Sequence, residues 1–147
     1  ARYRMTVNMI PSPYINGERR ADYYRAISGG NALSDFNGKE NTKQIIFAGN
    51  NPAAAIACNL YADSGVPETS WYLPAMGELG YLANRMATIE STFNLLGFAR
   101  PSYCARLWSS TENAAGSAWA LGVSMSNVIT NSKTTACCVY PFMRYAA

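Results

Sequence analysis

The residues Leu107-Trp108-Ser109-Ser110-Thr111-Glu112 mark the point at which the sequence changes from helical to strand-like patterning. From Arg106 onward, short apolar runs alternate with turn residues such as Gly116, which is typical of strands joined by tight connections. This texture predicts an antiparallel meander at the C-terminus. The expected strands cover residues 106–110, 118–123, 127–131 and 139–145.

Two helices are predicted upstream of this sheet. Asn41 and Thr42 can cap a first helix that starts at Lys43. Asn50-Asn51-Pro52 interrupts that helix, because proline disfavours the helical conformation in the residue before it. The helix resumes over residues 53–62, where apolar side chains recur at helical spacing and predict a core-facing stripe of Ala54, Ala57, Cys58 and Tyr61.

Trp71-Tyr72-Leu73-Pro74 leads into the second helix, since proline suits a first helical turn. Glu78 lies near the positive N-terminal end of this helix and is expected to cap it. The predicted buried face then runs as far as Gly97, through Leu79, Leu82, Met86, Ile89, Phe93 and Leu96.

The N-terminal part of the chain predicts one strand and a long connection. Residues 3–10 alternate loosely and end at Pro11, which favours an opening strand. Residues 11–41 are rich in Gly, Pro, Asn and Ser and predict loop, with a short helical turn over residues 23–27. The expected fold class is α+β, with two helices, a small antiparallel sheet, and the first strand paired with the last.

The composition limits the functions that the chain can perform. The 147 residues suit one domain, 1–147, and 49% of them are hydrophobic, whereas only 14% are charged. The chain has no histidine, which removes the commonest general base and metal ligand together. No long apolar run predicts a membrane span, and a net charge of +3 gives no reason to expect nucleic acid. We therefore expect no catalytic residues, no metal and no cofactor.

Four cysteines are present, and no pair has Cys-x-x-Cys spacing. Adjacent Cys137 and Cys138 point to opposite faces of a strand and are not expected to bridge each other. One bridge between Cys58 and Cys104, or four unpaired thiols, both remain open. Because the chain starts at Ala1 without a signal peptide, a mature product or a C-terminal piece of a longer protein is expected.

Three motifs follow one another in a fixed order. They are Gly38-Lys39-Glu40-Asn41-Thr42, then Trp71-Tyr72-Leu73-Pro74 with Glu78-Leu79, then residues 107–112 with Ala118-Trp119, Lys133 and Val139-x-Pro141. Over roughly residues 38–145 this order resembles the C-terminal domain of collagen-like adhesins (the Lcl C-terminal domain group), which has a C-type-lectin-like fold and is found on gut-bacterial surface proteins. The resemblance implies an extracellular or cell-surface location, in a longer surface-anchored or pilus protein.

Within that group the chain most resembles the target proteins of diversity-generating retroelements, of bacteria or their phages. Their C-terminal region varies because a mutagenic reverse transcriptase randomises template adenines, chiefly in Asn codons. Between residues 113 and 139, 24 of 27 residues are reachable in this way, and the exceptions include Trp119 and Lys133, where the family keeps scaffold residues. The resemblance thus divides the chain into a scaffold, about 1–106, and a variable region, about 107–140.

The resemblance implies a ligand-binding surface made of variable side chains, held by inward-facing residues of the strands. Trp108, Trp119, Leu121, Val128 and Val139 are expected to anchor the inner face. The expected partner is a protein or glycan receptor. The candidate surface residues are Leu107, Asn113, Ala114, Ala115, Ser117, Ala120, Ser124, Thr130, Ser132, Thr135, Ala136, Cys137, Cys138 and Tyr140.

Departures from the family pattern leave alternatives open. Ala75 stands where the family usually has Ser, which breaks the capping box with Glu78, and Tyr140 replaces the usual Arg before Pro141. One alternative is an invariant adhesive or structural tip domain of a pilus or surface lipoprotein. A less favoured one is an enzyme related to formylglycine-generating enzymes, which share this fold but need a cysteine pair for copper, a geometry that adjacent Cys137 and Cys138 do not suit.

Overall fold

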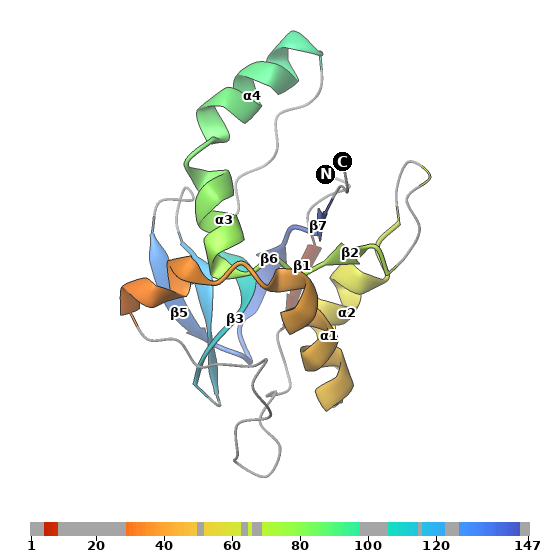
Figure 1. Ribbon diagram of the computed structural model, residues 1–147, viewed down its shortest axis with the longest axis vertical. Helices are drawn as coiled ribbons and strands as arrows, with labels where there is room; N and C mark the ends of the chain where they lie inside the picture. Colours follow the sequence, from red (N-terminus) through yellow and green to blue (C-terminus); the bar gives the residue numbers. More distant parts are fainter. Residues whose placement is uncertain are drawn as a thin grey trace.

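The computed structural model describes residues 5–8, 29–49, 52–62, 65, 69–97, 106–114, 116–122 and 127–144. The expected helical turn at residues 23–27 lies outside these ranges. Over the described residues the chain is α+β, as the sequence predicts, with four α-helices, one 3₁₀ helix and two sheets (Figure 1). No helix within these ranges is both long and apolar enough to cross a membrane.

The larger sheet has five strands in the order β1-β6-β3-β4-β5. The predicted meander is present, because β3 pairs with β4 and β4 pairs with β5, both antiparallel. β6 does not continue the meander but crosses over to lie between β1 and β3, parallel to β3. The strands are β1 (Met5–Asn8), β3 (Leu107–Ala114), β4 (Ser117–Leu121), β5 (Val128–Ser132) and β6 (Ala136–Val139).

The first strand was expected to pair with the last, but it pairs instead with β6, the strand before it. β1 and β6 are antiparallel, with Met5 opposite Val139 and Asn8 opposite Ala136. The strand expected over residues 139–145 is instead divided, because Pro141 cannot donate a hydrogen bond within a ladder. Its second part forms a separate two-stranded sheet, in which β7 (Phe142–Met143) pairs with β2 (Trp71–Tyr72).

The first helix begins earlier than the sequence predicts. A 3₁₀ helix, η1 (Gly29–Ser34), precedes α1 (Gly38–Ala48), so Asn41 and Thr42 lie inside α1 instead of capping it. Their side chains are buried and form the long-range hydrogen bonds described below. Pro52 separates α1 from α2 (Ala53–Asn59), as predicted, although α2 ends three residues short of the expected position.

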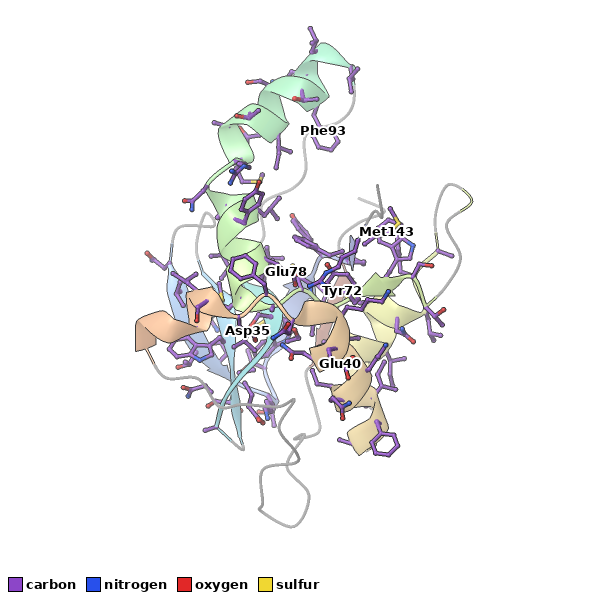
Figure 2. The ribbon with its side chains drawn as sticks, viewed as in Figure 1. Asp35, Glu40, Tyr72, Glu78, Phe93 and Met143 are labelled. Atoms are coloured by element: carbon purple, nitrogen blue, oxygen red, sulfur yellow. The ribbon has the colours of Figure 1, made fainter. Side chains whose placement is uncertain are left out.

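The second predicted helix is two helices, α3 (Met76–Ala83) and α4 (Met86–Leu95). The amide of Arg85 bonds the carbonyl of Leu82 at 3.0 Å, an i to i−3 contact that tightens the end of α3. α4 then extends away from the sheet, and Phe93 lies on this outlying part (Figures 1 and 2). The prediction that its apolar stripe is buried is wrong, since none of the residues of α4 is buried and Leu96 is 60% exposed.

Apolar side chains pack on both faces of the larger sheet. One face carries Trp108, Ala120 and Val139, which pack with Leu73 and with Ala54 of α2. The other face packs against α3 and η1 in a cluster of Ala32, Met76, Leu79, Leu107, Leu121 and Cys138. Because β3 and β6 are central strands, both faces of these strands are covered.

The predicted anchors do not share one inner face, because Trp108 and Val139 belong to the first cluster whereas Leu121 and Trp119 pack with the second. Trp108 and Val139 are fully buried, Leu121 is 3% exposed, and Trp119 is half-buried against the second cluster. Val128 is 37% exposed, whereas its neighbour Ile129 packs against the first cluster. The two are adjacent apolar residues, so the sequence alone does not show which one faces inward.

Candidate binding surface

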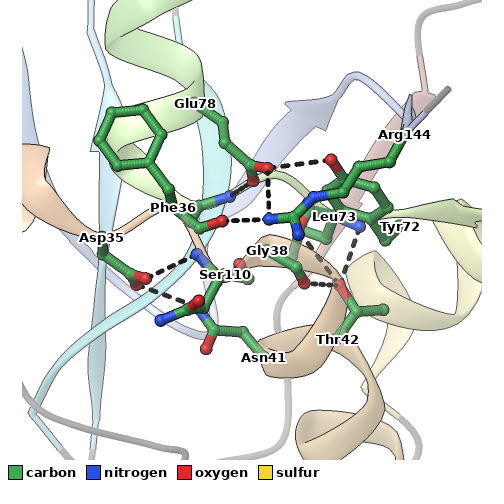
Figure 3. A network of polar contacts seen from close by, with 12 residues as sticks. Asp35, Phe36, Gly38, Asn41, Thr42, Tyr72, Leu73, Glu78, Ser110 and Arg144 are labelled. Atoms are coloured by element: carbon green, nitrogen blue, oxygen red, sulfur yellow. Dashed lines mark hydrogen bonds and ion pairs between the residues drawn. The ribbon is translucent and has the colours of Figure 1, made fainter. Parts of the chain in front are cut away.

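The three sequence motifs meet in the interior of the molecule. Thr42, from the first motif, accepts a hydrogen bond from the amide of Leu73 at 3.0 Å, and its hydroxyl lies 3.1 Å from the Leu73 carbonyl and 2.7 Å from that of Gly38 (Figure 3). The amide of Ser110, from the third motif, bonds the carbonyl of Pro74, from the second, at 2.8 Å. The motifs therefore recur together because they form one hydrogen-bonded unit.

Asp35 is the centre of this buried network. Its carboxylate accepts hydrogen bonds from the Asn41 side-chain amide at 2.9 Å, the Thr111 hydroxyl at 2.8 Å and the Asn37 amide at 3.0 Å. The Asn41 amide also lies 3.3 Å from the hydroxyl of Ser110. Asp35 was not singled out from the sequence, and the only local signal for it is an acid just before a helix in a loop rich in Asn and Gly.

The N-terminus of α3 is satisfied by groups from three parts of the chain. Glu78 accepts a hydrogen bond from the Ala75 amide at 2.8 Å, which confirms its predicted capping role. Ala75 has no side-chain acceptor to complete a capping box, and the next two amides bond elsewhere. The amide of Met76 donates to the Thr111 hydroxyl at 2.8 Å, and that of Gly77 to the Asp35 carbonyl at 2.9 Å. The tertiary structure thus replaces the missing serine cap.

Glu78 also links the helix to the smaller sheet (Figures 2 and 3). The Tyr72 hydroxyl donates to Glu78 at 2.9 Å, and the Arg144 guanidinium lies 3.5 Å from the same carboxylate oxygen. Burial, followed by the negative charge of Glu78, raises the pKa of Tyr72 to about 12. The phenol is therefore a hydrogen-bond donor at neutral pH, and its partner carboxylate is a satisfied acceptor.

The hydroxyl groups of β3 are engaged in the same way. Ser109 donates to the carbonyl of Trp119 at 2.6 Å, and Thr111 bonds Asp35. The first contact joins two neighbouring strands, whereas the second reaches the segment before α1, 76 residues away in sequence. Within the described ranges, no three Cys, Asp or Glu side chains gather as a possible metal site. The network connects the segment that follows η1 with α1, α3 and β3, and these elements form a frame that can carry a surface.

The candidate surface residues fall into four groups. Ala114, Thr130, Ser132 and Ala136 are exposed, and four others are half-buried, namely Asn113, Ser117, Thr135 and Tyr140. Ala115 and Ser124 lie outside the described residues. The expectation of exposure is wrong for the remaining four, which are buried: Leu107, Ala120, Cys137 and Cys138.

These four corrections share a physical reason. Leu107, Cys137 and Cys138 lie on the central strands β3 and β6, and Ala120 faces the first core cluster from β4. A side chain on a strand covered on both faces is buried whichever way it points. Cys137 is a free thiol, and burial raises its pKa. Cys138 is disulfide-bonded, so the adjacent pair is not bridged, as predicted.

Both open alternatives for the cysteines are wrong. Cys58 is a free, fully buried thiol whose pKa burial raises, so the open alternative of a Cys58–Cys104 bridge is wrong. Cys104 itself lies outside the described residues. Because Cys138 is disulfide-bonded, the alternative of four unpaired thiols is also wrong.

Five side chains lie on the same side of the last two strands of the meander, beside the second core cluster, and we call them the β4–β5 face. In the antiparallel register Ser117 lies opposite Ser132, Trp119 opposite Thr130, and Leu121 opposite Val128. Directly opposite residues share one face of a sheet, so the exposed or half-buried members project together. The β4–β5 face consists of Ser117, Trp119, Val128, Thr130 and Ser132.

A buried ion pair lies beside one end of the β4–β5 face. Lys133 contacts Glu112 directly, with side-chain exposures of 3% and 1%. The Lys133 amide also bonds the carbonyl of Gly116 at 2.9 Å. No side-chain partner was assigned to Glu112 from the sequence. The signal was present, because Glu112 is the last acid of the chain and Lys133 the only lysine after it.

The surface residues outside the β4–β5 face are dispersed. Ala114 lies opposite Ser117 at its edge, and Asn113 donates to the Ser117 hydroxyl at 2.9 Å. Ala136 instead lies on β6, opposite Asn8, and Tyr140 packs against the second core cluster. The structure therefore brings together only part of the predicted set. A scan against protein-family models and searches of curated proteins and solved structures gave no match to the chain.

Proposed function

We propose that this protein is a ligand-binding module of a cell-surface or phage-borne adhesin, with a C-type-lectin-like fold and a retroelement-diversified surface. The observation that carries the proposal is the β4–β5 face. Three of its members, Ser117, Thr130 and Ser132, are uncharged, small or polar, and at least partly exposed. They lie on the same side of the ribbon as Trp119, which is half-buried against the second core cluster, and the opposite side packs into the first.

The topology supports the fold assignment. The resemblance implies helices that precede a meander, which is the observed order, and a first strand that joins the C-terminal part of the sheet, where β1 pairs with β6 although not with the last strand, β7. The buried network around Asp35 adds a reason for a rigid frame, because its hydrogen bonds connect residues as distant in sequence as Asp35 and Thr111. Binding sites commonly consist of replaceable surface residues held by such a frame.

The burial pattern limits which positions can vary. Exposed substitutions usually change stability by only about 0.5 kcal/mol, whereas buried changes cost several times more. Variation is therefore expected at Ala114, Ser117, Thr130 and Ser132, and constancy at the positions of the buried ion pair. A protein or glycan receptor that contacts this face is the proposed partner.

The two alternatives differ in what they require. An invariant pilus or lipoprotein tip would have the same fold without a variable face. Its gene would have no template repeat and no reverse transcriptase gene beside it. A copper enzyme of the formylglycine-generating type needs a pair of converging thiols. Cys137 and Cys138 belong to core clusters on opposite faces of the sheet, which argues against that pair as joint ligands.

A pair of display libraries tests whether the face can carry diversity. One library randomises Ala114, Ser117, Thr130 and Ser132, and the matched control randomises the four buried positions Leu107, Ala120, Cys137 and Cys138. Most members of the first library should resist protease like the parent, and selection on immobilised lysozyme, an arbitrary target, should enrich binders. Most members of the second should be digested. Equal loss of folded members in both libraries would contradict the proposal.

A further inference from the structure

β5 is the last strand in the order of the larger sheet. Within the described part of the chain it pairs with β4 alone. Its five residues, Val128-Ile129-Thr130-Asn131-Ser132, contain no charge and no proline, and their pairing with β4 is regular. Natural edge strands usually carry a charge, a proline or a bulge that prevents another strand from adding. β5 has none of these.

Two hydrogen bonds, one at each end of the β4–β5 ladder, establish which residues of β5 face outward. The Lys133 amide bonds Gly116 at 2.9 Å, and the Gly122 amide bonds Asn127 at 2.5 Å. Both pairs continue the register in which Ala120 lies opposite Ile129. Hydrogen-bonded and non-hydrogen-bonded pairs alternate along an antiparallel ladder. Ile129 and Asn131 therefore direct their main-chain groups toward β4.

The main-chain groups of Val128, Thr130 and Ser132 consequently point away from β4. The Ser132 carbonyl accepts from the amide of Thr135 at 2.9 Å, within the following turn. No described residue bonds the N–H or C=O groups of Val128 and Thr130. The edge thus presents alternate donors and acceptors at the spacing of an extended chain.

We propose that the partner binds by adding an extended segment of its own polypeptide to the outer edge of β5. This inference rests on the proposed binding function and names its mode of recognition. Strand addition derives affinity from main-chain hydrogen bonds and specificity from alternate side chains. An extended peptide is the occupant that matches this row of groups, whereas a glycan has no such repeat.

In this arrangement the same three residues, Val128, Thr130 and Ser132, provide both the main-chain hydrogen bonds and the side-chain contacts. Their main-chain groups bond the added strand, and their side chains project on the β4–β5 face beside it. Variation at these positions changes the side chains and leaves the main-chain donors and acceptors in place. The flanking side chains are uncharged, so the matching segment has small or β-branched uncharged residues at alternate positions.

The test uses a display library of random nine-residue linear peptides as the probe, selected on the whole protein. Thr130→Pro removes one outward N–H, and Thr130→Ala keeps it while removing the same side chain. Proline is accommodated at an edge position that makes no ladder bond. Enriched peptides should bind Thr130→Pro about tenfold or more weakly, since a hydrogen bond is lost and the proline ring obstructs the edge. Thr130→Ala keeps the outward N–H and loses only the side-chain contact, so it should weaken binding clearly less than Thr130→Pro does.

Amide exchange measured by NMR gives a second readout that does not depend on the variants. Bound peptide should slow exchange at Val128 and Thr130 and leave Ile129 and Asn131, which already bond β4, little changed. If Thr130→Pro does not fold, the enriched peptides are instead N-methylated at alternate amides. These modified peptides should lose binding to the parent protein.

Three results would overturn strand addition. The first is that selection enriches no peptide. The second is that Thr130→Pro and Thr130→Ala weaken peptide binding equally. The third is that the free protein dimerises and already shows slow exchange at the outward amides, which would make a second copy of the chain the occupant of the edge. Equal weakening would indicate recognition by side chains and leave the proposed binding function standing. The libraries of the previous section test that function separately.

Discussion

Replacing Lys133 with methionine is expected to destabilise the protein strongly. Lys133 and Glu112 are in direct contact, with side-chain exposures of 3% and 1%. Removing one member of a buried pair leaves the other charge without compensation, which typically costs about 3–5 kcal/mol. For a chain of this size, each kcal/mol lowers Tm by roughly 2–4 °C, so Lys133→Met should lower Tm by roughly 6–20 °C. Urea unfolding followed by tryptophan fluorescence gives the free energy directly.

A matched surface pair provides the control. Lys43 lies 3.7 Å from Glu40, with side-chain exposures of 63% and 40%, so Lys43→Met should cost at most about 0.5 kcal/mol. A Lys133→Met/Glu112→Leu double variant should recover most of the stability, because replacing a buried pair with apolar residues is often neutral. A cost below about 1 kcal/mol for Lys133→Met, or an equal cost for the two lysine variants, would refute the reasoning.

Three further outcomes follow from the buried frame. Thr111→Val should cost about 1–3 kcal/mol in urea unfolding, because it leaves two buried partners without their hydrogen bonds, and a cost near zero would contradict the network. Gly38→Ala should lower Tm by several degrees, since its Cβ would lie 2.2 Å from the Glu78 carboxylate, whereas Gly116→Ala, with open space around it, should leave Tm nearly unchanged. The Cys58 thiol should resist iodoacetamide at pH 8 in native protein and react after denaturation, because burial raises its pKa; rapid native alkylation, seen by mass spectrometry, would show that it is accessible.

Local patterns predicted the elements of the sheet well. Turn residues and short apolar runs located β3, β4 and β5 to within a few residues. They did not determine which way β5 faces, because Val128 and Ile129 are both apolar and either could be the inner one. Nor did they show that β6 crosses to the centre of the sheet, where Cys137 and Cys138 are both buried. Burial on a covered strand depends on its neighbours, which no local pattern specifies.

The helical part shows a different limit. The apolar spacing from Leu79 onward predicted one buried helix, and α3 has a buried face as expected. The helix ends at Ala83, so the stripe continues on α4, which leaves the core. Spacing predicts which side of a helix is apolar, but the direction of each helix depends on its tertiary contacts.

The polar frame was the least predictable part of the candidate site. The motifs that contain Asn41, Thr42 and Thr111 were recognised, but Asn41 and Thr42 were expected only to cap a helix. Asp35 joins Asn41 and Thr111, the latter 76 residues away. Such contacts exist only after the chain folds, so the sequence indicates the participants without their partners.

Sequencing the DNA on both sides of the encoding gene tests the central proposal most directly. A diversified face predicts a near-identical repeat of the 3′ coding region next to a reverse transcriptase gene. The mismatches should fall at template adenines and affect the codons of Ala114, Ser117, Thr130 and Ser132. The absence of a repeat, or mismatches concentrated in the codons of buried residues such as Trp108 and Val139, would contradict the proposal.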